Sequence, residues 1–177
     1  RIAQISDVHI GPLLKKPFLE SVVSTVNGLE ADMVAVTGDL IDGTVDDLRE
    51  HIAPLAELQG RDGVFFCTGN HEYYWDAPAW IDHVRTLGLE PLINDHRMID
   101  KDGAKLLVAG CTDYRADRIL AEHASDPGGA KDGADPHDVS ILLAHQPKSI
   151  AAAAAAGYTL QLSGHTHAGQ FFPVSLF

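Results

Sequence analysis

Residues 33–39 read Met33-Val34-Ala35-Val36-Thr37-Gly38-Asp39, an apolar run that ends at a glycine and an aspartate. A continuous apolar run of this length, without alternating polar residues, is typical of a strand buried on both faces of a parallel sheet. Residues 64–68 and 139–144 repeat the pattern, and residues 1–6 give a shorter version of it. These runs predict the strands of an α/β domain, each followed by polar residues.

Helical patterns separate these strands. Apolar residues recur three to four positions apart over residues 16–29, 45–58 and 77–87, and residues 147–156 join an early proline to an alanine-rich segment. Strand and helix therefore alternate in the first half of the chain, which favours largely parallel pairing. Residues 90–94, 96–99 and 105–111 instead read as consecutive strands, with Asp102-Gly103 as a hairpin turn. We expect an antiparallel portion there, then a short helix at 117–123, a surface loop at 125–138 and a last strand at 158–162.

The composition is that of an ordinary globular domain, and we expect residues 1–177 to form a single one. Hydrophobic residues make up 45% of the chain and charged residues 21%. The net charge of −12 argues against a broad basic surface for nucleic acid. The sequence has neither a signal peptide nor an apolar run of about 18 residues that could span a membrane. Both ends look cut, because Arg1 leads directly into a strand and residues 171–177 are still apolar, so we expect a domain truncated at both ends.

Polar residues that can bind metal ions follow five of the predicted strands. They are Asp7 and His9, Asp39, Asn70 and His71, His145, and finally His165 and His167. In α/β folds the ligand site lies at the carboxyl ends of the strands, so these side chains should converge. Taken singly, an aspartate after a strand is usually a turn or a helix cap, and a histidine in a polar loop is usually solvated. That reading would have to hold five times at the same structural position, which favours a shared site.

The number of candidate ligands indicates more than one metal ion. Two carboxylates, four or five imidazoles and one amide oxygen exceed the needs of a tetrahedral zinc and suit two divalent ions of higher coordination number, such as Mn, Fe or Zn. One carboxylate must then bridge the ions, and Asp39 is the natural bridge because Gly38 lets the backbone approach closely. Two such ions outweigh the charge of Asp7 and Asp39, so the site suits a phosphate anion and a hydroxide derived from bound water.

The motifs around these residues resemble, in order, the five sequence blocks of the calcineurin-like metallophosphoesterase superfamily. They read Asp7-Val8-His9, Gly38-Asp39, Gly69-Asn70-His71-Glu72, His145 and Gly164-His165-Thr166-His167. The resemblance covers nearly the whole chain. It implies a four-layer αββα sandwich, in which two mixed β-sheets pack face to face with flanking helices outside. It also implies a hydrolase that acts on a small phosphate ester with a binuclear metal centre.

The same resemblance implies a role for each site residue. One metal ion would be held by Asp7, His9, Asp39 and His167, and the other by Asp39, Asn70, His145 and His165. His71 would lie over the phosphate, as a general acid for the leaving oxygen or as an electrostatic stabiliser. Asp42 matches a family aspartate that orients this histidine, and the alternative for Asp42 is an ordinary aspartate at a helix start.

The sequence leaves the substrate open. The ester could be a phosphomonoester or a phosphodiester, and the Tyr-Tyr-Trp segment at residues 73–75 could flank a substrate group or pack at the start of a helix. A nuclease of the same superfamily and a non-catalytic, protein-binding scaffold are alternatives. The acidic net charge weighs against the first, and the complete ligand set weighs against the second. The wording around the first and last motifs looks most like a bacterial subgroup that acts at the cell envelope, which implies membrane association through a segment outside these residues.

Overall fold

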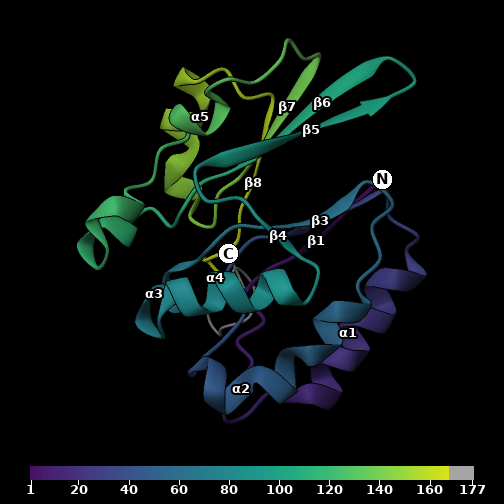
Figure 1. Cartoon of the computed structure of the whole chain (residues 1–177), viewed down its shortest axis with the longest axis vertical. Coiled ribbons are helices and arrows are strands. Elements are labelled where there is room, and N and C mark those ends of the chain that lie inside the picture. The colour runs from purple at the N-terminus through teal and green to yellow at the C-terminus, as the bar shows by residue number, and fades with distance from the viewer. Residues whose placement is uncertain (168–177) are drawn as a thin grey trace, which may run out of the picture.

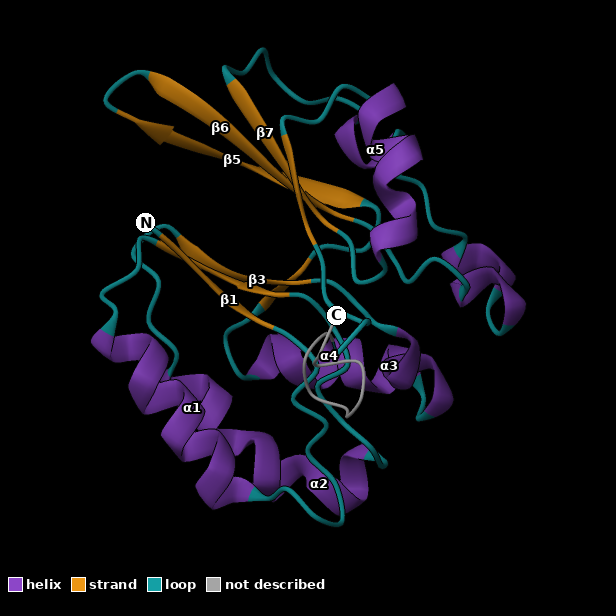
Figure 2. Cartoon of the chain, turned by 180° about the vertical axis from the view of Figure 1, so that it is seen from behind, coloured by secondary structure: helices purple, strands orange, loops and turns teal. Residues whose placement is uncertain are grey.

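The computed structural model describes residues 1–167, which fold into two four-stranded sheets packed face to face. Figure 1 shows helices α1, α2 and α4 against one sheet and helix α5 against the other. From behind, Figure 2 shows the four layers in order: helices, sheet, sheet, helix. The four-layer αββα class predicted from the sequence is therefore confirmed.

The first sheet is parallel throughout the described residues. Its strands follow chain order, β1 (Ile2–Ile5), β2 (Met33–Val36), β3 (Gly63–Phe66) and β4 (Glu90–Pro91). The connecting helices are α1 (Lys16–Gly28), α2 (Val45–Ile52), α3 (Asn70–Tyr74) and α4 (Ala77–Thr86). Right-handed crossovers that all step in the same direction place their helices on one face of the sheet. The opposite face is left free to pack on the second sheet.

The second sheet is mixed. Its order is β5 (Asp95–Lys101), β6 (Ala104–Gly110), β7 (Val139–Leu143) and β8 (Leu160–Leu162). β5 and β6 form the expected antiparallel hairpin, and Asp102 and Gly103 turn it with φ of +56° and +84°. β6, β7 and β8 pair in parallel, with α5 (Ile150–Ala155) between the last two.

Alternate residues of one strand supply two separate cores. In β2, Val34 and Val36 pack with the helices, whereas Met33 and Ala35 pack between the sheets. In β7, Ile141 lies in the core between the sheets and its neighbour Leu142 packs on the α5 side. Because both faces of these strands are covered, nearly every position is apolar, and the exception, Ser140 in β7, donates its hydroxyl to the carbonyl of Gly157.

Some local expectations were wrong in detail. The short helix expected at 117–123 is two 3-10 turns, Ala116–Arg118 and Ala121–His123, because the extended backbone of Leu120 separates them. The strand expected at 90–94 pairs only over Glu90–Pro91, because Asn94 turns the chain at a positive φ of 51°. The helix at 147–156 starts as a 3-10 turn, Pro147–Ser149. Among the helices of residues 1–167, none has the length and apolar character that a membrane crossing requires.

Candidate metal centre

All the candidate ligands follow strands whose carboxyl ends meet at one side of the sandwich. Asp7 and His9 follow β1, Asp39 follows β2, Asn70 and His71 open α3 after β3, His145 follows β7, and His165 and His167 follow β8. Both sheets thus contribute to one region. The structure brings the aspartates and histidines of this set together in three overlapping groups, which are Asp7, His9 and His167, then His9, Asp39 and His71, and finally Asp39, His145 and His165.

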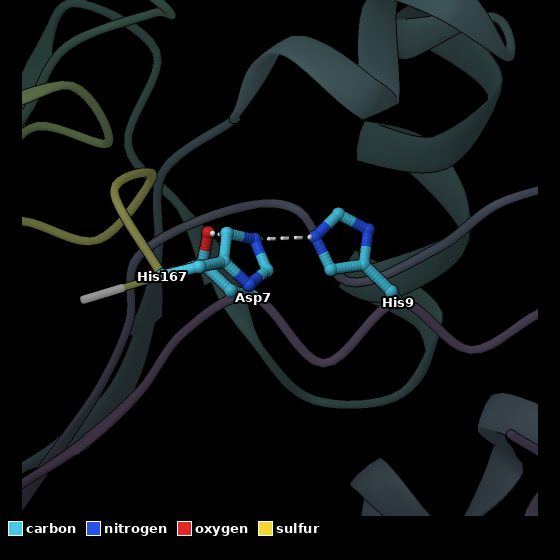
Figure 3. A group of neighbouring side chains, drawn as sticks. All are labelled: Asp7, His9 and His167. Carbon is cyan, nitrogen blue, oxygen red and sulfur yellow. Dashed lines mark hydrogen bonds and ion pairs between the residues drawn. The ribbon is translucent and has the colours of Figure 1, made fainter. Parts of the chain in front are cut away.

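The first group consists of Asp7, His9 and His167 (Figure 3). The Nε2 atoms of His9 and His167 lie 3.1 Å apart, and His167 Nε2 lies 3.3 Å from Asp7 Oδ1. One ligand atom from each of the three residues falls within 4.8 Å of the others. Two imidazole nitrogens and a carboxylate that converge in this way present three lone pairs to one point, which is how a divalent cation is held.

The second group consists of Asp39, His145 and His165. His145 Nε2 lies 3.0 Å from Asp39 Oδ2 and 3.2 Å from His165 Nδ1. The same Asp39 Oδ2 lies 3.9 Å from His9 Nε2 in the first group. Asp39 is 2% exposed and faces both groups, which is the position that a bridging carboxylate needs.

Asn70 supplies an independent sign that a cation fits here. Its Oδ1 atom is buried and forms no hydrogen bond within the described residues. A buried acceptor without a partner costs roughly 1–3 kcal/mol, so such atoms are rare in folded proteins. A metal ion beside Asn70 would satisfy this oxygen, and the hard oxygen and imidazole donors around it suit Mn, Fe or Zn.

The backbone is strained at the candidate ligands. Asp7, His9, Asp39, His165 and His167 all adopt the left-handed region, with φ between 47° and 71°. This region is unfavourable for residues other than glycine, and such strain clusters at functional sites. A side chain on Gly38 would collide with the backbone of residues 68 and 69, and one on Gly164 would collide with Ser6 and Asp7. The two glycines therefore allow the close approach of the loops that the sequence predicted.

Hydrogen bonds from the surrounding backbone orient the ligands. His145 Nδ1 donates to the carbonyl of Thr37 at 2.7 Å, which leaves Nε2 directed at Asp39. The backbone N–H of His165 donates to both carboxylate oxygens of Asp7, and that of His71 donates to Asp39 Oδ1 at 2.9 Å. Such outer contacts fix the rotamer and basicity of a ligand before a metal ion binds.

Asp42 contacts His71 and does not cap a helix. Thr44 is the N-cap of α2, and its side chain accepts the N–H of Asp47. Asp42 Oδ1 accepts a hydrogen bond from His71 Nδ1, while Asp42 Oδ2 lies 3.3 Å from His9 Nδ1. The His71 ring is thereby held with Nε2 facing Asp39 Oδ2, at 3.9 Å. This geometry is that of an aspartate that orients a histidine.

Charges within the centre shift the pKa values of its members. Burial alone would raise the pKa of Asp39, but the hydrogen bond and charge of His145, together with the N–H of His71, hold it below its ordinary value. Burial alone would lower the pKa of His145, but Asp39 outweighs it and raises that pKa to about 9. Burial and the charge of His145 lower the pKa of His165, which favours the neutral, ligating imidazole.

Glu72, for which the sequence predicted no role, accepts hydrogen bonds from two loops of the candidate centre. Its side chain is 1% exposed and accepts the backbone N–H groups of Asp39, Leu40 and Gly69 at 3.0, 2.8 and 2.6 Å. Burial, reinforced by the charge of Asp39, raises the pKa of Glu72 to about 7. Glu72 thus ties the loop after β2 to the loop after β3. The available signal was a charged residue directly after two candidate ligands at a helix start.

The two tyrosines after His71 differ in whether they pack inside the domain or reach the surface, the two alternatives that the sequence left open. Tyr73 is 4% exposed, and its hydroxyl contacts Thr68 Oγ1 and His123 Nδ1, so it packs inside the domain. Tyr74 is 61% exposed, and its ring centroid lies 5.3 Å from that of His71. Both tyrosines line a cavity beside Asn70 and His165, but of the two only Tyr74 is exposed.

Proteins similar to this chain are metallophosphoesterases by name. A protein of Bos taurus named "Transmembrane protein with metallophosphoesterase domain" is 38% identical over 99% of the chain, which covers 42% of that protein. A metallophosphoesterase of Helicobacter pylori is also 38% identical over 99% of the chain, which covers 46% of it. The chain thus spans less than half the length of these two relatives.

Solved structures share the fold at low sequence identity. The calcineurin-like phosphoesterase YfkN from Bacillus subtilis aligns over 97% of this chain and 72% of its own, with a TM-score of 0.61 and 15% identity. A 5'-nucleotidase precursor from Thermus thermophilus aligns over 94% and 41%, with a TM-score of 0.61 and 14% identity. The family model described as calcineurin-like phosphoesterase matches residues 1–169. The chain therefore belongs to the calcineurin-like phosphoesterase family, whose members are metal-dependent hydrolases of phosphoric ester bonds.

Proposed function

We propose that the chain hydrolyses a phosphate ester in line, by attack of a hydroxide, with two divalent metal ions as cofactors. The observation that carries this proposal is the convergence of ligand-type side chains into two groups, Asp7, His9 and His167 and Asp39, His145 and His165, which a third group of His9, Asp39 and His71 links. When bound, the ions would supply positive charge toward the phosphate oxygens and make a water acidic enough to attack near neutral pH.

Each group would hold one ion. Asp7, His9 and His167 would bind the first, and Asn70, His145 and His165 would bind the second, with Asp39 shared between them. The buried Asn70 oxygen and the left-handed backbone of five candidate ligands support this division, because both carry a cost that metal binding would offset.

His71 would provide the proton for the leaving group. Asp42 accepts from His71 Nδ1 and orients the ring, so that Nε2 faces the centre, where it would donate its proton. As the bond between the attacking oxygen and phosphorus forms, the bond from phosphorus to the leaving oxygen breaks. That oxygen takes the proton from His71 Nε2, and the products are a phosphate and an alcohol.

A metal analysis combined with two model substrates tests the proposal. Protein that has been stripped with a chelator, reloaded with Mn²⁺, Zn²⁺ or Fe²⁺ and freed of excess metal should contain about two ions per chain. It should hydrolyse p-nitrophenyl phosphate or bis(p-nitrophenyl) phosphate, and the ratio of the two rates gives the preference for monoester or diester. Activity on DNA alone would favour the nuclease, and a chain that binds no metal and cleaves neither ester would favour the scaffold.

A membrane setting completes the proposal. The bovine relative and a Danio rerio relative are named as transmembrane proteins, and the chain covers 42% of each. We infer that the domain works beside a membrane, held there by a part of the protein outside these residues, and in bacteria at the cell envelope. Fractionation of cells that express the full-length gene should place the protein in the membrane pellet, and recovery in the supernatant would contradict this setting.

A further inference from the structure

Two arginines, Arg115 and Arg118, carry guanidinium groups that no residue among 1–167 neutralises. Among residues 1–167 neither guanidinium group forms a hydrogen bond or an ion pair. The other arginines each have an acceptor: Arg49 with Asp46, Arg61 with Asp32, Arg85 with Asp82, Arg97 with Glu90, and Arg1 with the carbonyl of Leu29. Both arginines are exposed, so their guanidinium groups are free to bind an anion from solution.

Both arginines line a cavity that adjoins the candidate metal centre. The cavity has a volume of about 220 Å³, and Asn70 and His165 of the second ligand group form part of its wall. Tyr74 and Ile119, which are 61% and 51% exposed, also line it. The cavity is thus bordered by two candidate ligands, by exposed apolar surface, by the buried carboxylate of Asp113 and by the positive charges of the two arginines.

The turn that carries the arginines is fastened to the centre. The carboxylate of Asp113 is 1% exposed and accepts the N–H of Arg115 at 2.9 Å and the side-chain amide of Gln146 at 2.9 and 3.2 Å. The N–H of Asp113 donates to Thr68 Oγ1 at the end of β3. Gln146 directly follows the candidate ligand His145. The arginines therefore sit on a positioned turn, which favours binding because little order is lost.

Tyr74 indicates which part of a substrate would enter this cavity. Its ring packs 5.3 Å from the ring of His71 and also lines the cavity wall. His71 is the residue that would protonate the leaving oxygen under the proposed function. A leaving group attached to that oxygen would pass Tyr74 and extend toward the arginines.

We propose that Arg115 and Arg118 determine specificity by binding a second anionic group, a carboxylate or a phosphate, on the leaving group of the ester. This inference rests on the proposed function. Guanidinium groups match both anions with paired hydrogen bonds. The cavity volume is below the usual range for drug-sized ligands, so the leaving group between the two anions is small, of the size of one ring or one sugar.

Matched phosphonates test the inference without the need for turnover. Phenylphosphonates that carry either a 4-carboxyl or a 4-carbamoyl group have nearly the same shape and differ by one charge, and 1,4-phenylene bisphosphonate carries a phosphate-like second anion. Isothermal titration calorimetry on the Mn²⁺-loaded chain gives the Kd of each. We expect the carboxyl ligand and the bisphosphonate, which each have a second anionic group, to bind about tenfold more tightly than the carbamoyl ligand. Comparison of the Kd of the carboxyl ligand with that of the bisphosphonate shows whether a carboxylate or a phosphate is the better second anion.

Single substitutions then assign the preference to the two arginines. Arg115→Ala and Arg118→Ala should each bring the ratio of the Kd of the carbamoyl ligand to the Kd of the carboxyl ligand closer to one. Arg115→Lys should recover part of the ratio. Arg85→Ala removes a paired arginine from α4 and should leave the ratio as it is. An unchanged ratio in both alanine variants, with all ligands still bound, overturns the inference and leaves the proposed function intact. If the unmodified chain binds none of the phosphonates and hydrolyses neither model ester, that result counts against the proposed function itself.

Discussion

Replacement of Asp39 by asparagine should remove metal ions from both groups at once. The substitution changes one oxygen to an amide nitrogen and leaves the size of the side chain nearly constant. In the structure Asp39 Oδ2 lies 3.0 Å from His145 Nε2 and 3.9 Å from His9 Nε2, so the lost charge faces both groups. Asparagine can still accept the N–H of His71 through Oδ1, which preserves the start of α3.

The magnitude follows from the position of the carboxylate. Loss of a group that only orients a ligand reduces metal affinity about 10–100-fold, so loss of a shared ligand should exceed about 100-fold for each ion. That factor corresponds to roughly 2.7 kcal/mol per ion. The rate of ester hydrolysis should fall together with metal content.

Inductively coupled plasma mass spectrometry on Mn²⁺-equilibrated, gel-filtered protein measures the effect. The Asp39→Asn variant should hold far less than one ion per chain, while the unmodified chain holds about two. Asp82→Asn is the control, since within the described part of the chain this exposed acid pairs only with Arg85 on the surface of α4. Circular dichroism should show the same secondary structure in both variants. Full metal content in a folded Asp39→Asn variant would refute the role of Asp39 as the shared ligand.

Three further predictions follow from the same geometry. The variant His71→Ala should keep its metal ions but lose about 10²–10⁴-fold in kcat, because the proton donor is removed and the ligand groups remain; equal loss of metal would show that His71 is a ligand instead. Glu72→Gln should lower the free energy of unfolding by about 1–3 kcal/mol, because one of the three buried N–H groups then faces an amide N–H₂, and thermal melting with and without Mn²⁺ measures it. Affinity for Mn²⁺ should rise with pH up to about 9, because Asp39 raises the pKa of His145 to about 9 and a proton that is held below that pH must leave before the imidazole can bind metal. Calorimetric titration of Mn²⁺ at pH 7, in buffers of different ionisation enthalpy, should therefore detect the release of about one proton per chain. The rate of ester hydrolysis should fall below about pH 6. The absence of proton release would contradict the assignment of His145 as a ligand.

Local patterns predicted the grouping of the candidate ligands better than the architecture. Asp39 and His145 attract attention because each lies at the end of a largely apolar run, and parallel strands bring their carboxyl ends together. The left-handed backbone of these loops leaves no mark in the sequence except the glycines beside them, such as Gly38 and Gly164. The convergence was thus predictable from strand order, whereas the distances within each group were not.

The division into two sheets could not be derived from periodicity. Met33 and Val34 are equally apolar, but one contacts the second sheet and the other contacts the helices. A strand covered on both faces gives the same pattern whether its neighbours are helices or strands, so the sandwich followed only from the resemblance to a known superfamily. No sequence pattern marks Arg115, because it is an exposed residue just before a short 3-10 turn.

Anomalous diffraction from a crystal of the Mn²⁺-saturated chain would show whether Asp39 joins two metal ions. We expect two manganese peaks about 3.5–4 Å apart on either side of Asp39. One should contact Asp7, His9 and His167, and the other should contact Asn70, His145 and His165. A single peak, or two peaks that leave Asp39 without a metal contact, would rule out a binuclear centre shared through Asp39.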